Sequence, residues 1–317
     1  MHVRVGTPLG SQGRSADLLR HPLLARIGRT PLVELRRVTG GGGPRVFAKL
    51  EGANPGGSVK DRAARAIVIE AIRRGELPSR RLLDATSGNT GIAYAMLGAA
   101  LGFGVTLCVP GSASPERLRI LRAYGSEVAL TDPLEGSDGA IRRARERIAE
   151  RPDLYFYADQ YSNPANPDAH ERTTGPEILD QLRGLSLDLF VAGLGTSGTF
   201  VGTGRFLRRA SPATRLVSVE PDGPFHGLEG LKHMATALVP AIYDPALADA
   251  RVGVPTEEAH EMTRRLAREE GLFVGPSSGA AVVAALAAGR EMGAPTVAVV
   301  FPDGGDRYVS DRFWGEP

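Results

Sequence analysis

Short apolar runs alternate with helical patterns along nearly the whole chain, and this alternation limits the possible folds more than any other feature of the sequence. The runs rich in Val, Leu and Phe, which are typical of strands, span residues 45–50, 81–86, 104–110, 127–131, 154–157, 188–193, 215–220, 272–275 and 296–301. Apolar residues at helical spacing predict helices, the clearest of them at 58–74, 114–124, 256–270 and 278–290. Strands that alternate with helices of this length are joined by crossover connections and form mostly parallel sheets. The sequence therefore predicts the α/β fold class.

Two lobes are predicted from the length of the chain and from one break in its pattern. A chain of 317 residues with 42% hydrophobic residues supplies enough material for one large or two medium-sized units. The Asn-Pro pairs at 163–164 and 166–167 interrupt the pattern and indicate a crossing near residue 153. We therefore expect lobes of residues 1–153 and 154–317, each an open, mostly parallel sheet flanked by helices. Residues 1–40 are predicted to pack on the other lobe.

The composition excludes several classes of protein. The formal net charge is only +2 and the basic residues are spread along the chain, which argues against a nucleic-acid partner. Cys108 is the single cysteine, so an intrachain disulfide is excluded, and we expect it to be a buried small hydrophobic residue. No metal site is predicted, because the sequence has no H-E-x-x-H motif and no pair of thiolates. Without an apolar segment of signal-peptide or membrane length, the sequence predicts a cytoplasmic protein with no membrane partner.

The three lysines stand out because 35 of the 38 basic residues are arginine. Lysine, unlike arginine, forms imines and loses its proton near neutral pH when its surroundings favour that. The three lysines are Lys49, Lys60 and Lys232. Lys60 lies in the first turn of the helix predicted at 58–74. The positive end of the helix dipole disfavours an ammonium group there and favours the neutral amine that a nucleophile needs. The alternative is an exposed lysine beside Asp61.

Two strand-to-helix turns carry polar groups suited to anions, because ligands of α/β sheets bind beyond the carboxyl ends of strands, at helix N-termini. The turn at 86–91, Thr-Ser-Gly-Asn-Thr-Gly, gathers hydroxyls, a carboxamide and backbone amides, which suits a carboxylate. The turn at 193–199, Gly-Leu-Gly-Thr-Ser-Gly-Thr, combines glycines with hydroxyls, which suits a phosphate. Ordinary N-capping of the first turn and a tight bend at the second are the alternatives.

Two other classes of enzyme fit the sequence less well. The turn at 275–279 matches the G-x-S-x-G motif of a hydrolase nucleophile, but the last histidine, His260, precedes Ser277 in the chain. A hydrolase of that fold has its histidine after the serine, so Ser277 is interpreted as a hydrogen-bonding residue. The turn at 193–199 lacks the spacing of the dinucleotide fingerprint, which disfavours an NAD-dependent oxidoreductase.

Six motifs together resemble those of the fold-type II pyridoxal-phosphate enzymes, in particular the cysteine synthase and cystathionine β-synthase group, with the closest likeness to cysteine synthases. They occur in the order of that family, at 29–35, 49–51, 54–62, 86–91, 195–199 and 277–279. The stretches 159–166 and 305–308 add to the resemblance, which spans about residues 27–313. It implies a pyridoxal 5′-phosphate enzyme that forms L-cysteine from O-acetylserine or O-phosphoserine and sulfide, through an α-aminoacrylate intermediate. It also implies a homodimer.

The resemblance further implies a role for each matching residue. Lys60 would form the Schiff base with the cofactor and then remove the Cα proton of the substrate. Asn89 would face the 3′-oxygen of the cofactor, and Ser277 its pyridine nitrogen, where a neutral hydroxyl favours elimination over transamination. The residues implied to hold the cofactor phosphate are Gly195, Thr196, Ser197, Gly198 and Thr199. Those implied to bind the substrate are Thr86, Ser87, Asn89, Thr90 and Gln160, with Gly230 and Lys232 in the loop that faces its leaving group.

Some residues leave the choice of reaction open. Cystathionine β-synthase and serine dehydratase would share Lys60 and every turn named above. Asp222 lies close to where phosphoserine-using relatives can place an arginine, and its charge would repel a phosphate. Lys232 has a second interpretation, a surface lysine. We expect His226 to be structural and His260 to face solvent.

Overall fold

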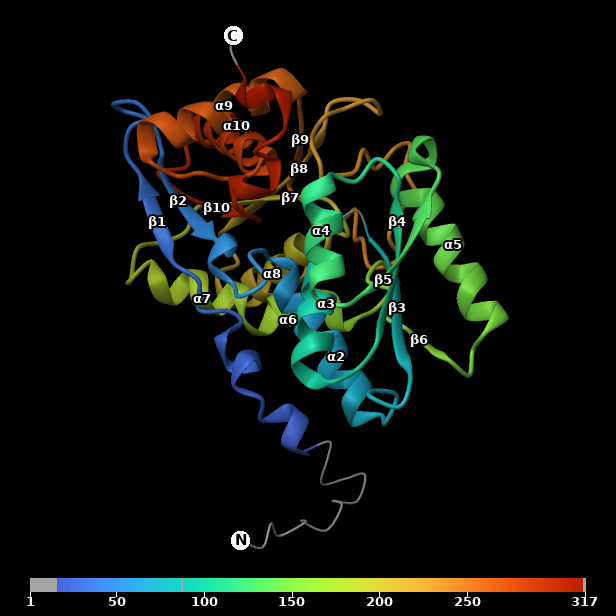
Figure 1. The fold of residues 1–317 in the computed structure, drawn as a ribbon. Coiled ribbons are helices and arrows are strands. Elements are labelled where there is room, and N and C mark those ends of the chain that lie inside the picture. The colour runs from blue at the N-terminus through green and yellow to red at the C-terminus, as the bar shows by residue number, and fades with distance from the viewer. Residues whose placement is uncertain (1–15, 87, 316–317) are drawn as a thin grey trace, which may run out of the picture.

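The structure is a computed structural model that describes residues 16–86 and 88–315. Its ribbon forms two lobes, each built on a sheet of its own (Figure 1). Every pair of neighbouring strands is parallel except β1 and β2. The predicted α/β class, with two mostly parallel sheets flanked by helices, is confirmed.

The larger sheet has six strands in the order β1-β2-β10-β7-β8-β9. These strands are β1 (Leu32–Leu35), β2 (Arg45–Leu50), β7 (Leu189–Gly193), β8 (Arg215–Pro221), β9 (Ala250–Val254) and β10 (Thr296–Phe301). Successive residues of a strand point to opposite faces. In β10, Val297 and Val299 pack with α9 and α10 on one face, whereas Ala298 and Val300 pack with α7 and α8 on the other. Helices therefore cover both faces, as a fully buried apolar strand requires.

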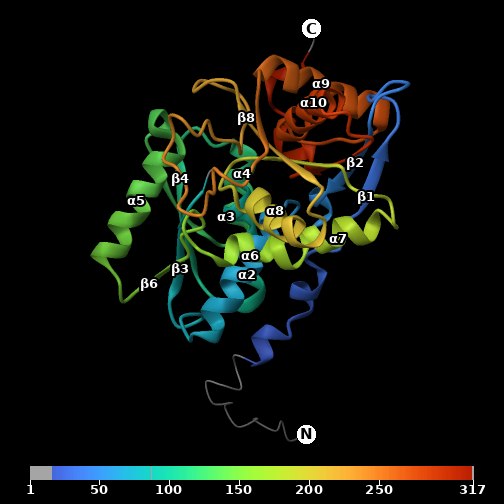
Figure 2. The same cartoon turned by 180° about the vertical axis from the view of Figure 1, so that it is seen from behind.

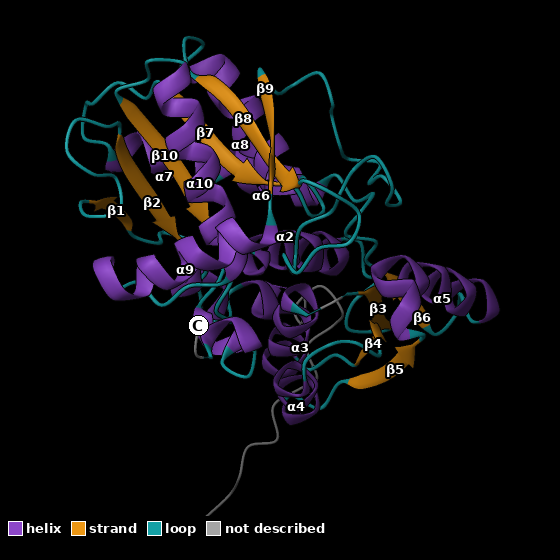
Figure 3. Cartoon of the chain, turned by 90° about the horizontal axis from the view of Figure 1, so that it is seen from above, coloured by secondary structure: helices purple, strands orange, loops and turns teal. Residues whose placement is uncertain are grey.

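The smaller sheet has four parallel strands in the order β5-β4-β3-β6. They are β3 (Arg81–Ala85), β4 (Val105–Pro110), β5 (Glu127–Thr131) and β6 (Tyr155–Tyr157). Leu82 packs with α2, α3 and α4, while its neighbour Leu83 packs with α5 on the opposite face. This sheet lies beside the larger one, as the view from above shows (Figure 3).

The helices differ in how much of their surface is buried. Their bounds are α2 (Lys60–Arg73), α3 (Asn89–Leu101), α4 (Pro115–Ala123), α5 (Gly136–Glu150), α6 (Ala165–Arg172), α7 (Thr174–Gln181), α8 (Gly198–Ala210), α9 (Thr256–Glu270) and α10 (Pro276–Glu291). Short 3₁₀ segments are η1 (Pro22–Arg26), η2 (Glu51–Ala53), η3 (Pro133–Glu135), η4 (Gly305–Tyr308) and η5 (Arg312–Trp314). α3 and α10 are apolar on nearly every side and are buried accordingly. Seen from behind, α6 and α8 lie side by side near the centre of the molecule (Figure 2).

Several sequence-based expectations need correction. The strand predicted at 272–275 is wrong, since only Val274 makes an isolated bridge there, while β1 and β9 were not predicted as strands. A single division at residue 153 is also wrong. It assigns β2 to the first lobe and β6 to the second, but β2 pairs with β10 and β6 pairs with β3. Residues 1–15 of the segment predicted to pack on the other lobe lie outside the described residues.

The fold brings several loops to one place. Parallel strands end at the same edge of a sheet, and the chain leaves β7 and β10 at that edge of the larger sheet and β3 at that edge of the smaller one. The turns that follow β3 and β7 enter α3 and α8 directly, and the loop after β10 carries Asp303. In the part of the chain that the structure describes, no helix is long and apolar enough to cross a membrane.

Candidate active site

A cavity of about 590 Å³ opens where the loops of the two lobes meet, and a smaller cavity of about 40 Å³ shares several of its walls. The predicted site residues that line the larger cavity are Lys60, Thr86, Asn89, Thr90, Gln160, Gly195, Thr196, Gly230 and Lys232. Those that the smaller cavity adds are Ser197, Thr199 and Ser277. Gly198 begins α8 next to these residues, and Ser87 lies outside the described residues. The structure therefore brings together the predicted residues that it describes, while their individual roles stay predictions.

Lys60 is the first residue of α2 and lines both cavities. The helix begins two residues later than the predicted start, because Ser58 forms a bridge with Asp303 and Val59 is the N-cap. Burial lowers the pKa of the Lys60 amine, and the nearby charge of Asp303 opposes that effect. This environment favours the neutral amine, which is the nucleophilic form. The interpretation of Lys60 as an exposed lysine beside Asp61 is wrong.

Asn89 opens α3, and charged residues hold both ends of its carboxamide. Its Nδ2 donates to Asp303 Oδ2 at 2.6 Å, and its Oδ1 accepts from the Arg307 guanidinium. Arg307 also donates to the carbonyl of Gly56, in the turn that precedes Lys60. The loop after β10 thus contacts both the turn before α2 and the start of α3.

The turn after β3 is tied to Gln160. Thr86 Oγ1 accepts from the backbone amides of Gly88 and Gly91 at 3.0 and 3.1 Å, which shapes the turn. Thr90 Oγ1 donates to Gln160 Oε1 at 2.6 Å, and Gln160 Nε2 donates to the carbonyl of Ala85 at 2.7 Å. Since an amide nitrogen has two hydrogens, one N–H of Gln160 stays available to an anion in the cavity.

The turn at 195–199 forms a cup at the start of α8. Ser197 has a φ of 70°, in the left-handed region, and its buried Oγ has no hydrogen-bond partner among the described residues. A Cβ on Gly195 would lie 2.2 Å from the carbonyl oxygen of Gly230, and one on Gly198 would lie 2.0 Å from Asn166 Oδ1, so both positions need glycine. Asn166 Nδ2 donates to Thr196 Oγ1 at 3.1 Å and also to the carbonyl of Gln160 at 2.7 Å. Asn166 therefore links the cup to the residue that holds the turn after β3.

Two ion pairs join the lobes across the larger cavity. Arg117 on α4 pairs with Glu229, and its guanidinium lies 5.0 Å from the centre of the Tyr308 ring. Lys232 Nζ lies 2.7 Å from Asp138 Oδ1 at the start of α5. Lys232 is only 7% exposed, so its interpretation as a surface lysine is wrong.

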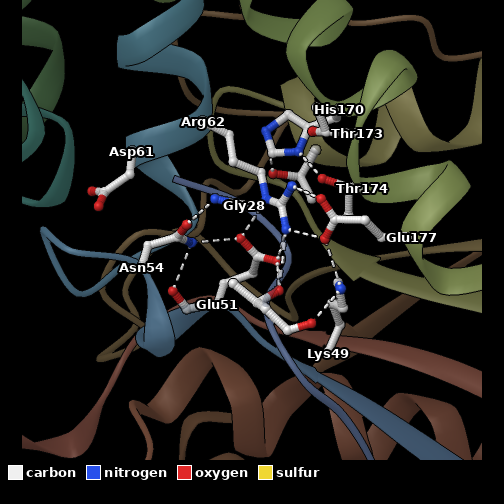
Figure 4. A network of polar contacts seen from close by, with 12 residues as sticks. Gly28, Lys49, Glu51, Asn54, Asp61, Arg62, His170, Thr173, Thr174 and Glu177 are labelled. Atoms are coloured by element: carbon white, nitrogen blue, oxygen red, sulfur yellow. Dashed lines mark hydrogen bonds and ion pairs between the residues drawn. The ribbon is translucent and has the colours of Figure 1, made fainter. Parts of the chain in front are cut away.

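A buried ionic network includes Arg62, which lies two residues after Lys60 in α2 (Figure 4). Arg62 on α2 donates to Glu51 at 2.7 Å and to Glu177 at 2.7 Å, and Lys49 Nζ lies 2.8 Å from Glu177. Burial alone would raise the pKa of Glu177, but hydrogen bonds from Arg62 and Lys49 outweigh it and lower that pKa to about 2. Burial lowers the pKa of Lys49, and Glu177 opposes that shift. The network has as many cations as anions, and it fixes the first turn of α2 against η2 and α7.

Other residues singled out in the sequence have structural positions. Cys108 is fully buried, as predicted, and burial raises its pKa to about 11. Asp222 is exposed and is not among the residues that line the larger cavity, whereas His226 is. His260 stacks on Phe313 with ring centres 4.3 Å apart, so the expectation that it faces solvent is wrong. Within residues 16–86 and 88–315, no group of His, Cys, Asp or Glu could hold a metal ion.

Sequence reasoning did not single out Arg117 or Asp303, and it gave no individual role to Asn166, Arg307 and Tyr308, which lie in the stretches 159–166 and 305–308 that carry the resemblance. Asp303 follows the apolar run of β10 after one residue, Pro302, so its place near the strand end was a usable signal. The sequence carries no comparable signal for Arg117, because its contact with Tyr308 depends on how the two lobes meet.

Comparison with known proteins identifies the family. The model of the pyridoxal-phosphate dependent enzymes matches residues 23–303. The chain belongs to this family. Cysteine synthase of Aquifex aeolicus (strain VF5) is 44% identical over 316 residues, which cover 97% of this chain and 96% of that protein. The expected resemblance is thereby confirmed.

Solved structures agree with the family and with its fold. The crystal structure of cysteine synthase (OASS) from Entamoeba histolytica aligns with a TM-score of 0.87 and 34% identity, over 100% of this chain and 95% of that chain. The structure of an O-acetylserine dependent cystathionine β-synthase from Helicobacter pylori aligns with a TM-score of 0.85 and 37% identity, over 91% and 97%. This pyridoxal-phosphate-dependent enzyme is therefore a cysteine synthase-like transferase of fold-type II.

The residues around the two cavities fit pyridoxal phosphate. A phosphate needs a cup of donors, which the unpartnered Ser197 hydroxyl and the close glycines of the turn at 195–199 provide. The aldehyde needs a neutral amine, and Lys60 lines the same small cavity as that cup. The ring nitrogen needs a neutral partner if elimination is to dominate, and the hydroxyl of Ser277 lines this cavity too.

Proposed function

We propose that this enzyme forms L-cysteine by β-replacement, with O-acetylserine as donor and sulfide as acceptor. One observation carries the proposal: the amine of Lys60, whose pKa burial lowers, meets the cup at 195–199 and the polar turn after β3 at two adjoining cavities. In this reaction the Cβ–O bond of O-acetylserine breaks, acetate leaves, and the sulfur of sulfide forms the new bond to Cβ.

The chain's own residues divide the work. The bound cofactor supplies an electron sink for the bond cleavage at Cα. Lys60 Nζ accepts the Cα proton, since its surroundings favour the neutral amine. The turn after β3 and Gln160 bind and orient the substrate carboxylate through backbone N–H, hydroxyl and amide donors. The cup at 195–199 and Ser277 hold the cofactor phosphate and its ring nitrogen.

The charges of the larger cavity favour an acetylated over a phosphorylated donor. Apart from Lys60, which the cofactor engages, the Lys and Arg side chains in its wall are Arg117 and Lys232, and each is paired with a carboxylate. Glu135 also lies in the wall and is paired with Arg142, so among the described residues it leaves no free positive charge there either. A phosphate dianion would have to break these pairs or remain uncompensated, whereas an acetyl group brings no charge.

The test is to mix the purified protein with O-acetylserine and, separately, with O-phosphoserine, and to record the visible spectrum before sulfide is added. We expect a rapid spectral change and cysteine formation with O-acetylserine, and at least tenfold lower kcat/KM with O-phosphoserine. If O-phosphoserine is the better donor and Lys232→Ala lowers kcat/KM only for O-phosphoserine, then Lys232 binds the phosphate group of the donor. In that case the donor proposed here is wrong. Equal losses with both donors would deny Lys232 that role.

Two neighbouring activities are outcomes of the same experiment. Faster product formation with homocysteine than with sulfide would indicate a cystathionine β-synthase, and pyruvate without added sulfur would indicate a dehydratase. The homodimer and the cytoplasmic location stay predictions.

A further inference from the structure

The segment after β10, residues 302–308, contacts both the start of α3 and the turn before α2. The function proposed above assigns no role to this segment. Asp303 is 2% exposed and lines the smaller cavity with Lys60. Its Oδ2 accepts hydrogen bonds from Asn89 at 2.6 Å and from the Tyr308 hydroxyl at 2.7 Å. Its Oδ1 is buried and has no hydrogen-bond partner in the part of the chain that the structure describes. Because an unpaired buried carboxylate oxygen is costly, this atom points to a partner that the site itself supplies.

Asp303 and Arg307 together fix the orientation of the Asn89 carboxamide. A carboxylate only accepts hydrogen bonds and a guanidinium only donates them. Nδ2 of Asn89 must therefore face Asp303, and Oδ1 must face Arg307, as the structure has them. A flipped amide would place two acceptors together at one end and two donors at the other. The orientation of the residue implied to face the cofactor is thus imposed by two charges from a different part of the chain.

Asp303 is also the anionic neighbour of the Lys60 amine. Burial lowers the pKa of Lys60, and the charge of Asp303 counteracts this. Other charged or titratable groups also lie near Lys60, and one of them, Glu229, lines the smaller cavity with it. Asp61 on α2 accepts from the amide of Gly56, and burial raises its pKa to about 7. Arg307 faces Asn89 and Gly56, and burial lowers the pKa of His170 on α6 well below its usual value.

We propose that Asp303 is a positioning residue of this active site. Its carboxylate holds Asn89 in the orientation that faces the cofactor, and it balances the charge of the Lys60 amine until the cofactor joins it. The inference rests on the proposed function, in that both residues act on pyridoxal phosphate. Without the carboxylate, Asn89 is free to flip, and the protonated form of Lys60 has lost its counter-charge.

The test compares two substitutions in the same segment. Asp303→Asn removes the charge and keeps the shape, while Asp306→Asn changes an exposed residue and is the matched control. The cofactor is removed from the purified holoenzyme, and the resulting apoenzyme is titrated with pyridoxal phosphate at several pH values. The rate at which the visible band of the bound cofactor appears reports the fraction of Lys60 that is neutral. We expect Asp303→Asn to lower the midpoint of this pH dependence by about one unit and to weaken cofactor affinity about tenfold. Asp306→Asn should match the wild type in both.

The inference is overturned if Asp303→Asn and Asp306→Asn give the same pH midpoint and the same affinity for pyridoxal phosphate. If circular dichroism shows that Asp303→Asn does not fold, Asp303→Ser, a smaller neutral variant, is measured and judged in the same way. A wild-type protein that gains no band, or a Lys60→Ala variant that keeps it, overturns the proposed function as well. The failure of the inference alone is therefore distinguishable from the failure of the function.

Discussion

At the scale of single residues, Asp84 is an acidic group that the fold keeps protonated. It is fully buried on β3, and burial raises its pKa to about 8 even though the backbone amides of Ala85 and Gln160 donate to it. The folded protein therefore binds a proton that the unfolded chain releases above about pH 4. Stability falls as the pH rises through this window, up to the folded pKa.

Asp84→Asn tests this directly, because the amide cannot ionise. We expect the wild type to lose about 1 kcal/mol more unfolding free energy between pH 7 and pH 8 than the variant does, since only the wild type releases a proton from this group when it unfolds. Urea unfolding at the two pH values measures the difference, with Asp306→Asn as an exposed control. Identical pH dependence in Asp84→Asn and the wild type would show that Asp84 is already ionised.

The sequence predicted those site residues that can be recognised from their immediate neighbours in the chain. Lys60, the turn at 86–91 and the cup at 195–199 each sit at a helix start directly after a strand or turn, where composition alone signals an anion site. The roles of Asp303 and Arg307 at Asn89 could not be predicted in this way. They join positions more than 200 residues apart in the chain, and the pairing depends on where β10 lies in the sheet.

At the scale of elements, the buried network of Figure 4 positions the helix that carries Lys60. Glu51 in η2 is fully buried and accepts from Thr30, Asn54 and Arg62. Removing one partner of a buried ion pair leaves the other charge without compensation, which costs more than the pair itself contributes.

We therefore expect Glu51→Gln to lower the free energy of unfolding by about 3 kcal/mol. The matched control is Glu70→Gln, which breaks an exposed pair with Arg74 on the same helix and should cost at most about 1 kcal/mol. Urea denaturation of both variants gives the comparison. Equal losses in the two would mean that the network contributes no more than a surface pair.

Element boundaries followed the sequence where periodicity was strong. The helix at 256–270 matches α9, and the strand at 296–301 matches β10. Elements whose apolar runs were short were harder to predict. Leu272 and Val274 pack on the core, but Phe273 between them is exposed and the segment lacks a neighbouring strand, while β9 alternates half-buried and exposed residues at the sheet edge.

At the scale of the whole molecule, the two sheets point the carboxyl ends of their strands at one shared space. The proposed cofactor site combines the cup of the larger sheet with the turn of the smaller one, and the ion pairs Arg117–Glu229 and Lys232–Asp138 join the lobes across the larger cavity. The α/β class with mostly parallel sheets was predictable from the alternation of strands and helices, and two lobes were predictable from the length of the chain and the break at the Asn-Pro pairs. The exchange of β2 and β6 between the predicted lobes was not, because strand pairing over such distances leaves no local pattern.

The central claim is that one amine of this enzyme joins pyridoxal phosphate, and the chain offers only three lysines as candidates. Borohydride reduction of the purified protein, followed by proteolysis and mass spectrometry, identifies the modified residue. We predict that the pyridoxyl group is found on the peptide containing Lys60, with Lys49 and Lys232 unmodified. Its presence on either of those lysines, or its absence from all three, would contradict the account.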